Sequence, residues 1–398
     1  LAGLKARQKN NIQEAMAAEI EGREQVLLEA NQKDMDSGRQ AGLTPALLDR
    51  LQLTPERIRA MAQAIRAVAK LPDPVGRTLR RWSRPYGLVI CKRRVPIGVI
   101  AIIYEARPNV TADAAALCLK TANAVILRGG KEASASNLAI VEALRAGGRR
   151  RGLPEDAIQL ITITGHRAIH ELVRLEGLVD LVIPRGGQAL IRSVVEHARV
   201  PVIKHYQGIC HIFVDESAAP AMALEIIENA KCQRPAVCNA VETLLVHRGI
   251  ASAFLPQLAR RLTRCGVELR GDAASQELVP GIRAAREADW RAEYLALILA
   301  VRIVPSVSAA IAHINHYGSH HSDAIITAST AAAKLFTQEV DSAAVYVNAS
   351  TRFTDGGEFG LGAEMGISTD KLHARGPMGL EELTTYKFVI SGQGQVRR

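Results

Sequence analysis

Hydrophobic positions in the first 70 residues recur every three or four residues, which is the spacing of amphipathic helices. The clearest helix begins at Thr54, a good N-cap residue, with Pro55 at the first helical position. The segment 71–76, Leu-Pro-Asp-Pro-Val-Gly, then interrupts the pattern. We therefore expect helices over 1–70. The apolar residues that follow Pro55 on one face are Ile58, Met61, Ile65 and Val68.

After residue 95 the pattern changes to short apolar runs that alternate with helical segments such as 112–122 and 134–144. This alternation predicts βαβ units and parallel sheets. The predicted strands form two series, which indicate two α/β domains. The first series is 99–103, 124–127, 160–164 and 178–183. The second is 212–214, 243–246, 297–303, 323–326 and 344–348. A glycine-rich loop at 355–362 and a last strand at 383–390 follow.

Composition agrees with this class of fold. Aromatic residues make up only 4% of a chain that is 48% hydrophobic, which suits helices on buried parallel strands. The net charge of +10 indicates either affinity for anions or simply a basic, soluble surface. The basic residues are scattered, with one run at 149–151 and no interleaved aromatics. We therefore do not expect nucleic-acid binding.

The cysteines and the N-terminus predict a cytoplasmic protein. Six cysteines are too few for a disulfide framework in 398 residues, and none form a C-x-x-C pair, so we expect no metal. The polar N-terminus has no signal-peptide core. The longest strongly apolar stretch, 95–104, is about half of a membrane span, so we expect no membrane association.

One cysteine has a setting that suits chemistry. The segment 231–243, Lys-Cys-Gln-Arg-Pro-Ala-Val-Cys-Asn-Ala-Val-Glu-Thr, places Cys238 after a proline turn and before an apolar run. A thiolate is a strong nucleophile when cations such as Lys231 or Arg234 lie near it. Taken alone, the segment fits a buried structural cysteine better. No G-x-G-x-x-G motif follows a predicted strand, so a nucleotide would need another arrangement.

The segment around Cys238 resembles the nucleophile motif of the γ-glutamyl phosphate reductases, a branch of the aldehyde dehydrogenase superfamily. Four other segments resemble the same family in the same order. They are 94–109 (Arg-Val-Pro-Ile-Gly-Val-Ile to Tyr-Glu-Ala-Arg-Pro-Asn), 124–132 (Ala-Val-Ile-Leu-Arg-Gly-Gly-Lys-Glu), 204–211 (Lys-His-Tyr-Gln-Gly-Ile-Cys-His) and 348–377 (Asn-Ala-Ser-Thr-Arg-Phe to Ala-Arg-Gly-Pro). The resemblance covers almost the whole chain. The family pattern differs at Leu297, where proline is usual, and at 355–358.

The resemblance implies an α/β, aldehyde dehydrogenase-like fold with two parallel-sheet domains and a small oligomerisation sheet. Residues 1–77 and 97–207 would form the cofactor-binding domain, and 208–375 the catalytic domain. Residues 78–96 and 376–398 would form the oligomerisation segments of a homodimer or homotetramer.

The resemblance also implies the reaction. NADPH would reduce L-glutamate 5-phosphate to L-glutamate 5-semialdehyde and phosphate, the second step of proline biosynthesis. Cys238 would attack the acyl phosphate and hold the acyl group as a thioester. The backbone N–H of Cys238 and the side chain of Asn109 are candidate oxyanion donors, although Ala106 stands where the superfamily has its asparagine. The stretch 204–208 lacks a carboxylate that could activate water, which suits an enzyme that must not hydrolyse its thioester.

By resemblance, a further set of residues would hold the cofactor. Lys131 replaces a ribose-binding glutamate and favours the 2′-phosphate of NADPH, and Glu293 matches the carboxylate that holds the nicotinamide ribose. The predicted cofactor ligands are Arg128, Lys131, Arg185, Gly186, Gly187 and Glu293. Without the resemblance, the charged residues among them would be interpreted as surface charges and the glycines as part of a turn.

The substrate carries a phosphate group and an α-carboxylate, and the planar guanidinium group of an arginine can bind either of them through two hydrogen bonds. Arg107 ranks first because of its place in the motif, while any single arginine is otherwise a surface residue. The predicted substrate ligands are Arg107, Lys204, His205, Asn348, Ser350, Arg352 and Arg375.

Three alternatives remain open. The first is another acyl-phosphate or acyl-CoA reductase of the same fold. The second is a non-catalytic anion- or nucleic-acid-binding protein, in which Cys238→Ala would be harmless. The third is the reductase half of a bifunctional kinase–reductase. The chain opens directly on the reductase helices, which favours a monofunctional enzyme with glutamate 5-kinase as a candidate partner.

Overall fold

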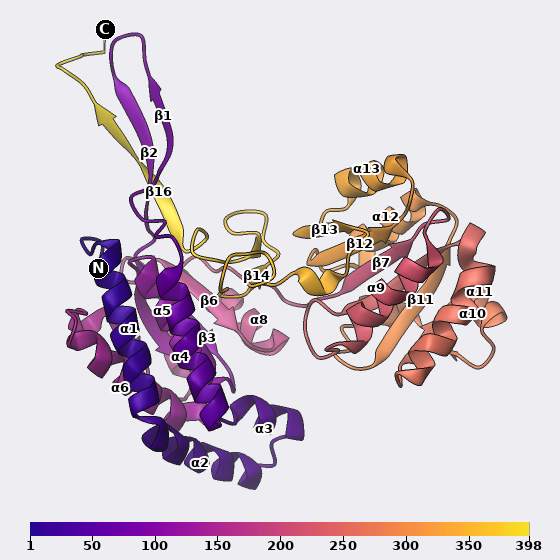
Figure 1. The fold of residues 1–398 in the computed structure, drawn as a ribbon, viewed down its shortest axis with the longest axis horizontal. Helices are drawn as coiled ribbons and strands as arrows, with labels where there is room; N and C mark the ends of the chain where they lie inside the picture. Colours follow the sequence, from indigo (N-terminus) through magenta and orange to yellow (C-terminus); the bar gives the residue numbers. More distant parts are fainter. Residues whose placement is uncertain (398) are drawn as a thin grey trace. The chain divides into compact units, whose positions relative to one another are not determined.

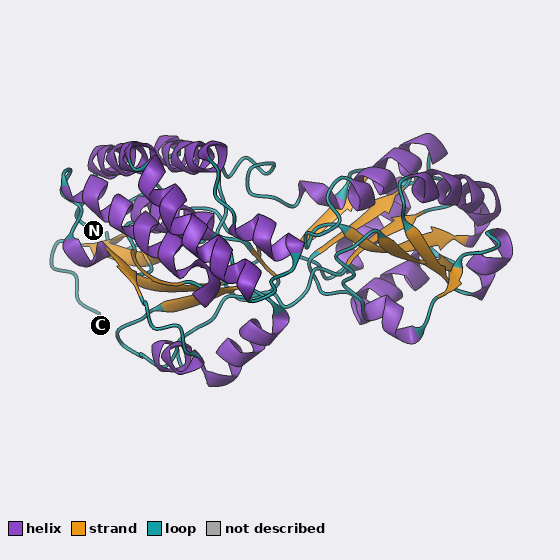
Figure 2. Cartoon of the chain, turned by 90° about the horizontal axis from the view of Figure 1, so that it is seen from below, coloured by secondary structure: helices purple, strands orange, loops and turns teal. Residues whose placement is uncertain are grey.

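The computed structural model describes residues 1–397, so only residue 398 of the predicted segment 376–398 lies outside the described residues. The chain divides into two units, each with its own sheets (Figures 1 and 2). Unit 1 comprises Leu1–Lys204, Gly360–Gly366 and Met378–Arg398, and unit 2 comprises His205–Phe359 and Ile367–Pro377. Within the described residues, we find no helix with the length and apolar character that crossing a membrane requires.

Helices fill the first 70 residues of unit 1, as the spacing predicts. Thr54 caps the fourth helix by accepting a hydrogen bond from Arg57 N at 3.2 Å, and Pro55 is its first residue. The apolar face of this helix is buried against its neighbours. The four helices are α1 (Ala6–Gly22), α2 (Glu24–Gln40), α3 (Pro45–Leu51) and α4 (Pro55–Lys70).

The parallel sheet of unit 1 has the strand order β5-β4-β3-β6. Its central strand β3 is buried from residue 100 to 104 because helices cover both faces. The strands are β3 (Val99–Tyr104), β4 (Ala124–Arg128), β5 (Ile158–Leu160) and β6 (Leu181–Arg185). The helices between and after them are α5 (Pro108–Lys120), α6 (Ser134–Arg149), α7 (His166–Leu172) and α8 (Gln188–His197), with short helices η1 (Lys131–Ala133) and η2 (Glu155–Ala157).

Two predicted strands of this sheet are displaced. The run 160–164 is a strand only at Leu160, because β5 pairs with β4 alone and β4 ends at Arg128. The run 178–183 begins three residues too early. Leu178 is 68% exposed and belongs to a turn, in which its N–H donates to Leu175 O at 3.1 Å.

A three-stranded antiparallel sheet completes unit 1. It joins β1 (Thr78–Ser83), β2 (Val89–Pro96) and β16 (Thr384–Ser391) in the order β1-β2-β16, so the two predicted segments do pair. Figure 1 shows this ribbon projecting away from the helices of unit 1. Near its tip, the Gln395 side chain donates to Tyr86 O at 2.8 Å.

Unit 2 is built on a seven-stranded parallel sheet with the order β10-β9-β11-β8-β7-β12-β13. Five of its strands match the second predicted series, while the short strands β9 and β10, at one side of the sheet, were not predicted. The strands are β7 (Cys210–Val214), β8 (Val241–His247), β9 (Glu268–Gly271), β10 (Arg283–Ala284), β11 (Ile298–Val304), β12 (Ser322–Ile326) and β13 (Ala344–Val347). A two-stranded sheet of β14 (Ile367–Ser368) and β15 (Gly376–Pro377) lies apart from it.

Helices cover both faces of this sheet, which produces two apolar cores. One core contains Phe254 and Leu258 of α10, and the other contains Phe213 of β7 stacked on Phe336 of α13. The helices are α9 (Pro220–Cys232), α10 (Arg248–Arg264), α11 (Ala273–Leu278), α12 (Val307–Tyr317) and α13 (Thr330–Glu339), with short helices η3 (Glu287–Arg291) and η4 (Thr351–Phe353).

Candidate active site

Cys238 lies partly buried in the loop 233–240 between α9 and β8, which we call the Cys238 loop. Its carbonyl oxygen accepts a hydrogen bond from the Cys210 thiol at 3.2 Å. Burial raises the pKa of Cys210 well above its usual value, so this side chain remains a donor. A Cβ added at Gly208 would stand 2.5 Å from Cys238 Cα, and closer still to its oxygen. The chain entering β7 therefore fixes the backbone of Cys238, and only glycine fits at position 208.

His205 belongs to the same cluster. Its ring meets the ring of buried His321 edge-on, with centroids 5.9 Å apart. The Nδ1 atom of His321 lies 3.7 Å from the Cys210 sulfur and 2.9 Å from Ser322 Oγ. His205 is thus connected, through His321 and Cys210, to the carbonyl of Cys238.

Glu293 also reaches this cluster, from the loop between η3 and β11. Its Oε1 accepts a hydrogen bond from Gly208 N at 2.9 Å. Partial burial raises the pKa of Glu293, and the Gly208 N–H bond opposes that shift. Gly208 therefore contacts both Cys238 and Glu293, although the two are 55 residues apart in the chain.

Arg352, in η4, is held by residues that flank the nucleophile. Its Nε donates to Gln233 Oε1 at 3.1 Å and its Nη1 donates to Asn239 Oδ1. Burial lowers the pKa of Arg352, the nearby Arg234 lowers it further, and Cys238 acts in the opposite direction. Arg234 of the Cys238 loop and Arg352, which is bonded to that loop, are close enough to affect each other's charge, and their guanidinium groups suit a phosphate group.

The other predicted substrate residues of unit 2 have different surroundings. Ser350 caps η4 by accepting from Arg352 N at 3.3 Å. Arg375 pairs with Asp341 at 2.8 Å. Asn348 follows β13 at the carboxyl edge of the sheet, whereas Cys238 precedes β8 at the amino edge.

The side-chain amide of Asn348 forms two hydrogen bonds at the carboxyl edge. It accepts from Thr327 N and donates to Thr327 O, both at 2.9 Å. The structure does not bring Asn348 to Cys238, so we leave it out of the substrate set proposed below.

In unit 1, the predicted Arg107 is the N-cap residue of α5 and Asn109 lies in the first turn of that helix, and both are exposed. The amide of Asn109 donates to Asp113 Oδ2 at 3.0 Å. Burial raises the pKa of Asp113 to about 6, and the bond from Asn109 opposes the shift. Ala106 is buried, and its N–H donates to Glu132 Oε1 at 2.7 Å. Lys204, the last residue of the first stretch of unit 1, is partly buried.

A cavity of about 210 Å³ opens in unit 1 where β4 and β5 end. It lies at the carboxyl edge of a parallel sheet, where α/β proteins commonly bind nucleotides. Its lining combines glycines and small polar residues with aliphatic side chains, which suits the apolar faces and polar edges of a nucleoside. The lining includes Gly129, Gly130, Ser134, Asn137, Leu160 and Thr162.

The two predicted cations near this cavity differ in their availability. The buried Arg128 guanidinium donates to Gly129 O at 3.0 Å and to Thr164 O, and so ties the end of β4 to the loop after β5. Lys131 is exposed in η1. Lys131 is therefore better placed than Arg128 to meet an added phosphate group.

Carboxylates bind backbone N–H groups at the N-termini of α6 and α8, two of the helices that begin at this edge. Asp34 accepts from Ala135 N at 3.1 Å and from Ser136 N at 2.7 Å, which caps α6. Glu105 accepts from Gly187 N at 2.8 Å, at the start of α8. A carboxylate from the β3–α5 turn therefore binds the N–H of Gly187, which is one of the predicted cofactor ligands.

Gly186 and Arg185 are packed in the same region. A Cβ at Gly186 would stand 2.7 Å from the Glu105 carboxyl carbon. The Arg185 guanidinium lies against Gly366, where a Cβ would stand 2.7 Å from Arg185 Cζ. These close approaches explain why glycine occurs at both positions.

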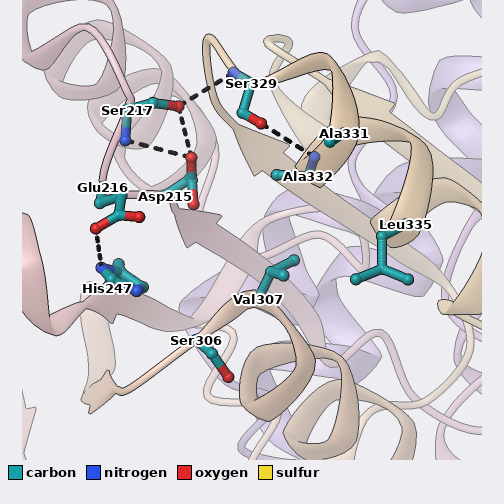
Figure 3. Close-up of a pocket in the computed structure, with 10 residues that line it drawn as sticks. All are labelled: Asp215, Glu216, Ser217, His247, Ser306, Val307, Ser329, Ala331, Ala332 and Leu335. Atoms are coloured by element: carbon teal, nitrogen blue, oxygen red, sulfur yellow. Dashed lines mark hydrogen bonds and ion pairs between the residues drawn. The ribbon is translucent and has the colours of Figure 1, made fainter.

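A second cavity, of about 340 Å³, lies at the carboxyl edge of the unit 2 sheet (Figure 3). Its polar groups bond to one another: Ser217 Oγ donates to Asp215 at 2.6 Å and accepts from Ser329 N at 3.1 Å. These bonds lower the pKa of Asp215 despite its burial. The network organises the loops after β7 and β12, on the edge opposite to Cys238.

No group of three or more His, Cys, Asp or Glu side chains suited to a metal ion occurs within residues 1–397.

Several residues of the site were not predicted from the sequence. Gly208 and Cys210 belong to the motif segment 204–211, but nothing in the sequence assigned either residue a role. The ion pair of Lys231 with Glu242 was hidden, because no pattern indicated that either side chain is buried.

Comparison with known proteins supports the family that the sequence motifs indicate. A model of the aldehyde dehydrogenase family matches residues 3–290. A gamma-glutamyl phosphate reductase of Geotalea daltonii is 53% identical over 398 residues, which is 100% of this chain and 95% of that protein. One from Carboxydothermus hydrogenoformans is 56% identical, over 100% of this chain and 96% of that protein.

Solved structures agree. The crystal structure of gamma-glutamyl phosphate reductase from Thermotoga maritima is 48% identical, covers 100% of this chain and 96% of that one, and superposes with a TM-score of 0.98. An acetylating aldehyde dehydrogenase from Geobacillus thermoglucosidasius, 16% identical with a TM-score of 0.70 over 100% of this chain and 94% of that one, shares the fold alone.

Two α/β units, each built on a parallel sheet, and a cysteine before the central strand of one sheet agree with the family match, and the chain is a member of the aldehyde dehydrogenase family. The full-length matches are more specific than the fold. The chain belongs, within that family, to the gamma-glutamyl phosphate reductases.

Proposed function

We infer that this chain reduces L-glutamate 5-phosphate to L-glutamate 5-semialdehyde and releases phosphate, as a step of proline biosynthesis. The observation that supports this most strongly is identity of 53% to 56% with gamma-glutamyl phosphate reductases along the whole chain. The Cys238 loop, with two guanidinium groups beside it, provides the matching chemistry.

In the proposed reaction the Cys238 thiolate attacks the acyl carbon, and the bond to the phosphate oxygen breaks. The leaving phosphate takes the electron pair of that bond, and Arg352 and Arg234 stabilise its charge. The acyl group remains on sulfur as a thioester. The Cys238 N–H and the Asn109 amide are the proposed donors to the oxyanion. Arg107, Lys204, His205, Ser350 and Arg375 complete the proposed substrate ligands.

A nicotinamide cofactor, which we propose to be NADPH, supplies the hydride that reduces the thioester carbon, and the C–S bond then breaks to give the semialdehyde and the free Cys238 thiolate. The residues of the unit 1 cavity fit the nucleoside part of such a cofactor. Lys131 would meet the 2′-phosphate, with Arg128 shaping the end of β4. Arg185, Gly186 and Gly187 would line the pyrophosphate region, and Glu293 would accept hydrogen bonds from ribose hydroxyls.

Reversing the charge of Lys131 tests the cofactor preference. Lys131→Glu should raise KM for NADP⁺ by about 10- to 100-fold, because a charge-assisted contact contributes about 1.5–3 kcal/mol. KM for NAD⁺ should change little. Steady-state kinetics with both cofactors measure this, and Lys33→Glu, on the exposed face of α2, is the matched control. Equal effects on both cofactors would contradict a contact with the 2′-phosphate.

We propose that the β1-β2-β16 sheet joins subunits into a homodimer or homotetramer. Tyr386, Phe388 and Ile390 of β16 are 49%, 51% and 56% exposed, an apolar row that a second subunit would cover. Phe388→Asp combined with Ile390→Asp should give a monomer by light scattering after gel filtration. An unchanged mass would contradict this role for the sheet.

We also propose that the enzyme works in the cytoplasm, where its six free cysteines would stay reduced. Glutamate 5-kinase is a proposed partner, because an acyl phosphate is labile and gains from direct transfer. Co-sedimentation of the two purified proteins tests that association.

The reaction is best tested in reverse, because the acyl phosphate is unstable. Glutamate semialdehyde, phosphate and NADP⁺ should produce NADPH, followed by absorbance. Replacing phosphate with coenzyme A distinguishes this function from that of an acyl-CoA reductase, which would turn over with coenzyme A and not with phosphate. Folded enzyme with neither activity would overturn the proposed function.

A further inference from the structure

A buried ion pair closes the base of the Cys238 loop. Lys231, in the last turn of α9, places its Nζ 2.6 Å from Glu242 Oε2, and both side chains are fully buried. The same Nζ donates to Val241 O at 2.9 Å. The pair therefore ties residue 231, before the loop, to residues 241 and 242, after it.

The other oxygen of Glu242 reaches a third segment. Its Oε1 accepts from Leu295 N at 3.2 Å. Leu295 has φ of +51°, in the left-handed region that leucine rarely adopts, so its backbone needs support from its surroundings. Two residues earlier is Glu293, which binds Gly208 N. Glu242 thus supports the turn that presents Glu293.

Tyr294 completes the connection between these segments. The Lys231 ammonium lies 6.0 Å from its ring centroid, and the Arg270 guanidinium lies 5.1 Å from it. Its hydroxyl donates to Asp289 Oδ1 at 2.6 Å. The residue between Glu293 and Leu295 is therefore fixed by Asp289, and its ring lies near the same lysine that closes the Cys238 loop.

Stability alone does not account for this arrangement. Removing two charges from water costs about as much as their attraction returns, so apolar side chains would serve a core equally well. Burial raises the pKa of Glu242 to about 7 against the opposing effect of Lys231, which shows how strongly the site is desolvated. Unlike apolar packing, this ion pair makes directional bonds: Lys231 bonds to the Val241 carbonyl, Glu242 bonds to the Leu295 N–H, and the two side chains bond to each other.

We propose that Lys231 and Glu242 are positioning residues that hold the Cys238 thiol and the Glu293 carboxylate in a fixed mutual geometry. This rests on the proposed roles of Cys238 in forming the thioester and of Glu293 in holding the cofactor ribose. Neither Lys231 nor Glu242 needs to touch substrate. Their effect passes through the backbone of the Cys238 loop and of the 293–295 turn.

The informative variant removes both charges together. Lys231→Met alone would leave a buried carboxylate unpaired and weaken the fold, whereas Lys231→Met with Glu242→Leu replaces the pair with apolar groups of similar size. We expect this double variant to melt close to the wild type. We expect kcat of the reverse reaction to fall about 100-fold, since small misplacements of reacting groups have effects of that size.

Two further readouts separate positioning from a structural role. KM for NADP⁺ should rise as Glu293 loses its place. The rate at which iodoacetamide alkylates Cys238, measured by mass spectrometry of its peptide, should change at least tenfold. The alkylation rate needs neither substrate nor cofactor, so it decides the proposal even if the wild type fails to reduce NADP⁺.

The chain offers a matched control in unit 1. Lys9, also fully buried, places its Nζ 2.6 Å from Asp73 Oδ2. Lys9→Met with Asp73→Leu should leave kcat and the alkylation rate of Cys238 within about twofold of the wild type. Wild-type kinetics and alkylation in the Lys231→Met/Glu242→Leu enzyme would overturn the proposal. If that variant does not fold, Glu242→Gln, of nearly equal shape, is judged by the same readouts and the same outcomes.

Discussion

Cys238→Ala is expected to lower the rate of phosphate-dependent NADP⁺ reduction by at least about 10⁴-fold, because removal of a covalent nucleophile eliminates the thioester route. The side chain is small and only partly buried, so the free energy of unfolding should change by less than about 1 kcal/mol. Steady-state kinetics and thermal unfolding of the purified variant measure the two effects.

Cys232→Ala is a suitable control for this result. Cys232 lies six residues earlier, at the end of α9, and is also a partly buried free thiol. Its replacement should leave the rate within about threefold of the wild type. Comparable losses in both variants would point to damage to the loop and not to nucleophilic catalysis by Cys238.

Gly208→Ala has the second largest expected effect. The new Cβ would stand 2.5 Å from Cys238 Cα and 2.6 Å from its carbonyl carbon, so backbone must move. Overpacking of this kind destabilises a protein by about 1–3 kcal/mol. The displaced nucleophile should lower kcat by about 100-fold. The Gly208 N–H bond to Glu293 moves as well, so KM for NADP⁺ should rise.

Gly22→Ala provides the comparison, because a Cβ at Gly22 of α1 meets no atom within 4 Å. Alanine there should be neutral or slightly stabilising. Urea unfolding and kinetics of both variants distinguish crowding at Cys238 from a general effect of glycine replacement. Full activity in Gly208→Ala would contradict the described packing of the Cys238 loop.

Much of the fold could be predicted from residue patterns. The apolar runs of β7, β8 and β12 are buried on both faces and flanked by helices, so periodicity and length identify them. The errors have local causes. Leu178 looks like the start of a strand because it is apolar, yet it belongs to the turn before β6. The edge strand β5 stops at Leu160 because its only partner stops.

The site was less accessible to sequence reasoning than the fold. Cys238 was found through its motif, since a thiol before an apolar run is not distinctive by itself. The capping of α6 by Asp34 joins residues about 100 positions apart, and no local pattern predicts it. Likewise, the sequence suggests Lys231 as a cation near the Cys238 thiol and does not indicate Glu242, the buried partner with which Lys231 pairs. Long-range contacts decide such roles, and a single sequence does not contain them explicitly.

The central claim is that an acyl group on Cys238 leaves only to phosphate. A stopped-flow experiment with semialdehyde and NADP⁺, but without phosphate, tests it most directly. We predict a burst of one NADPH per Cys238, followed by steady turnover only when phosphate is added. Continuous turnover without phosphate, or a burst that persists in Cys238→Ala, would contradict the account.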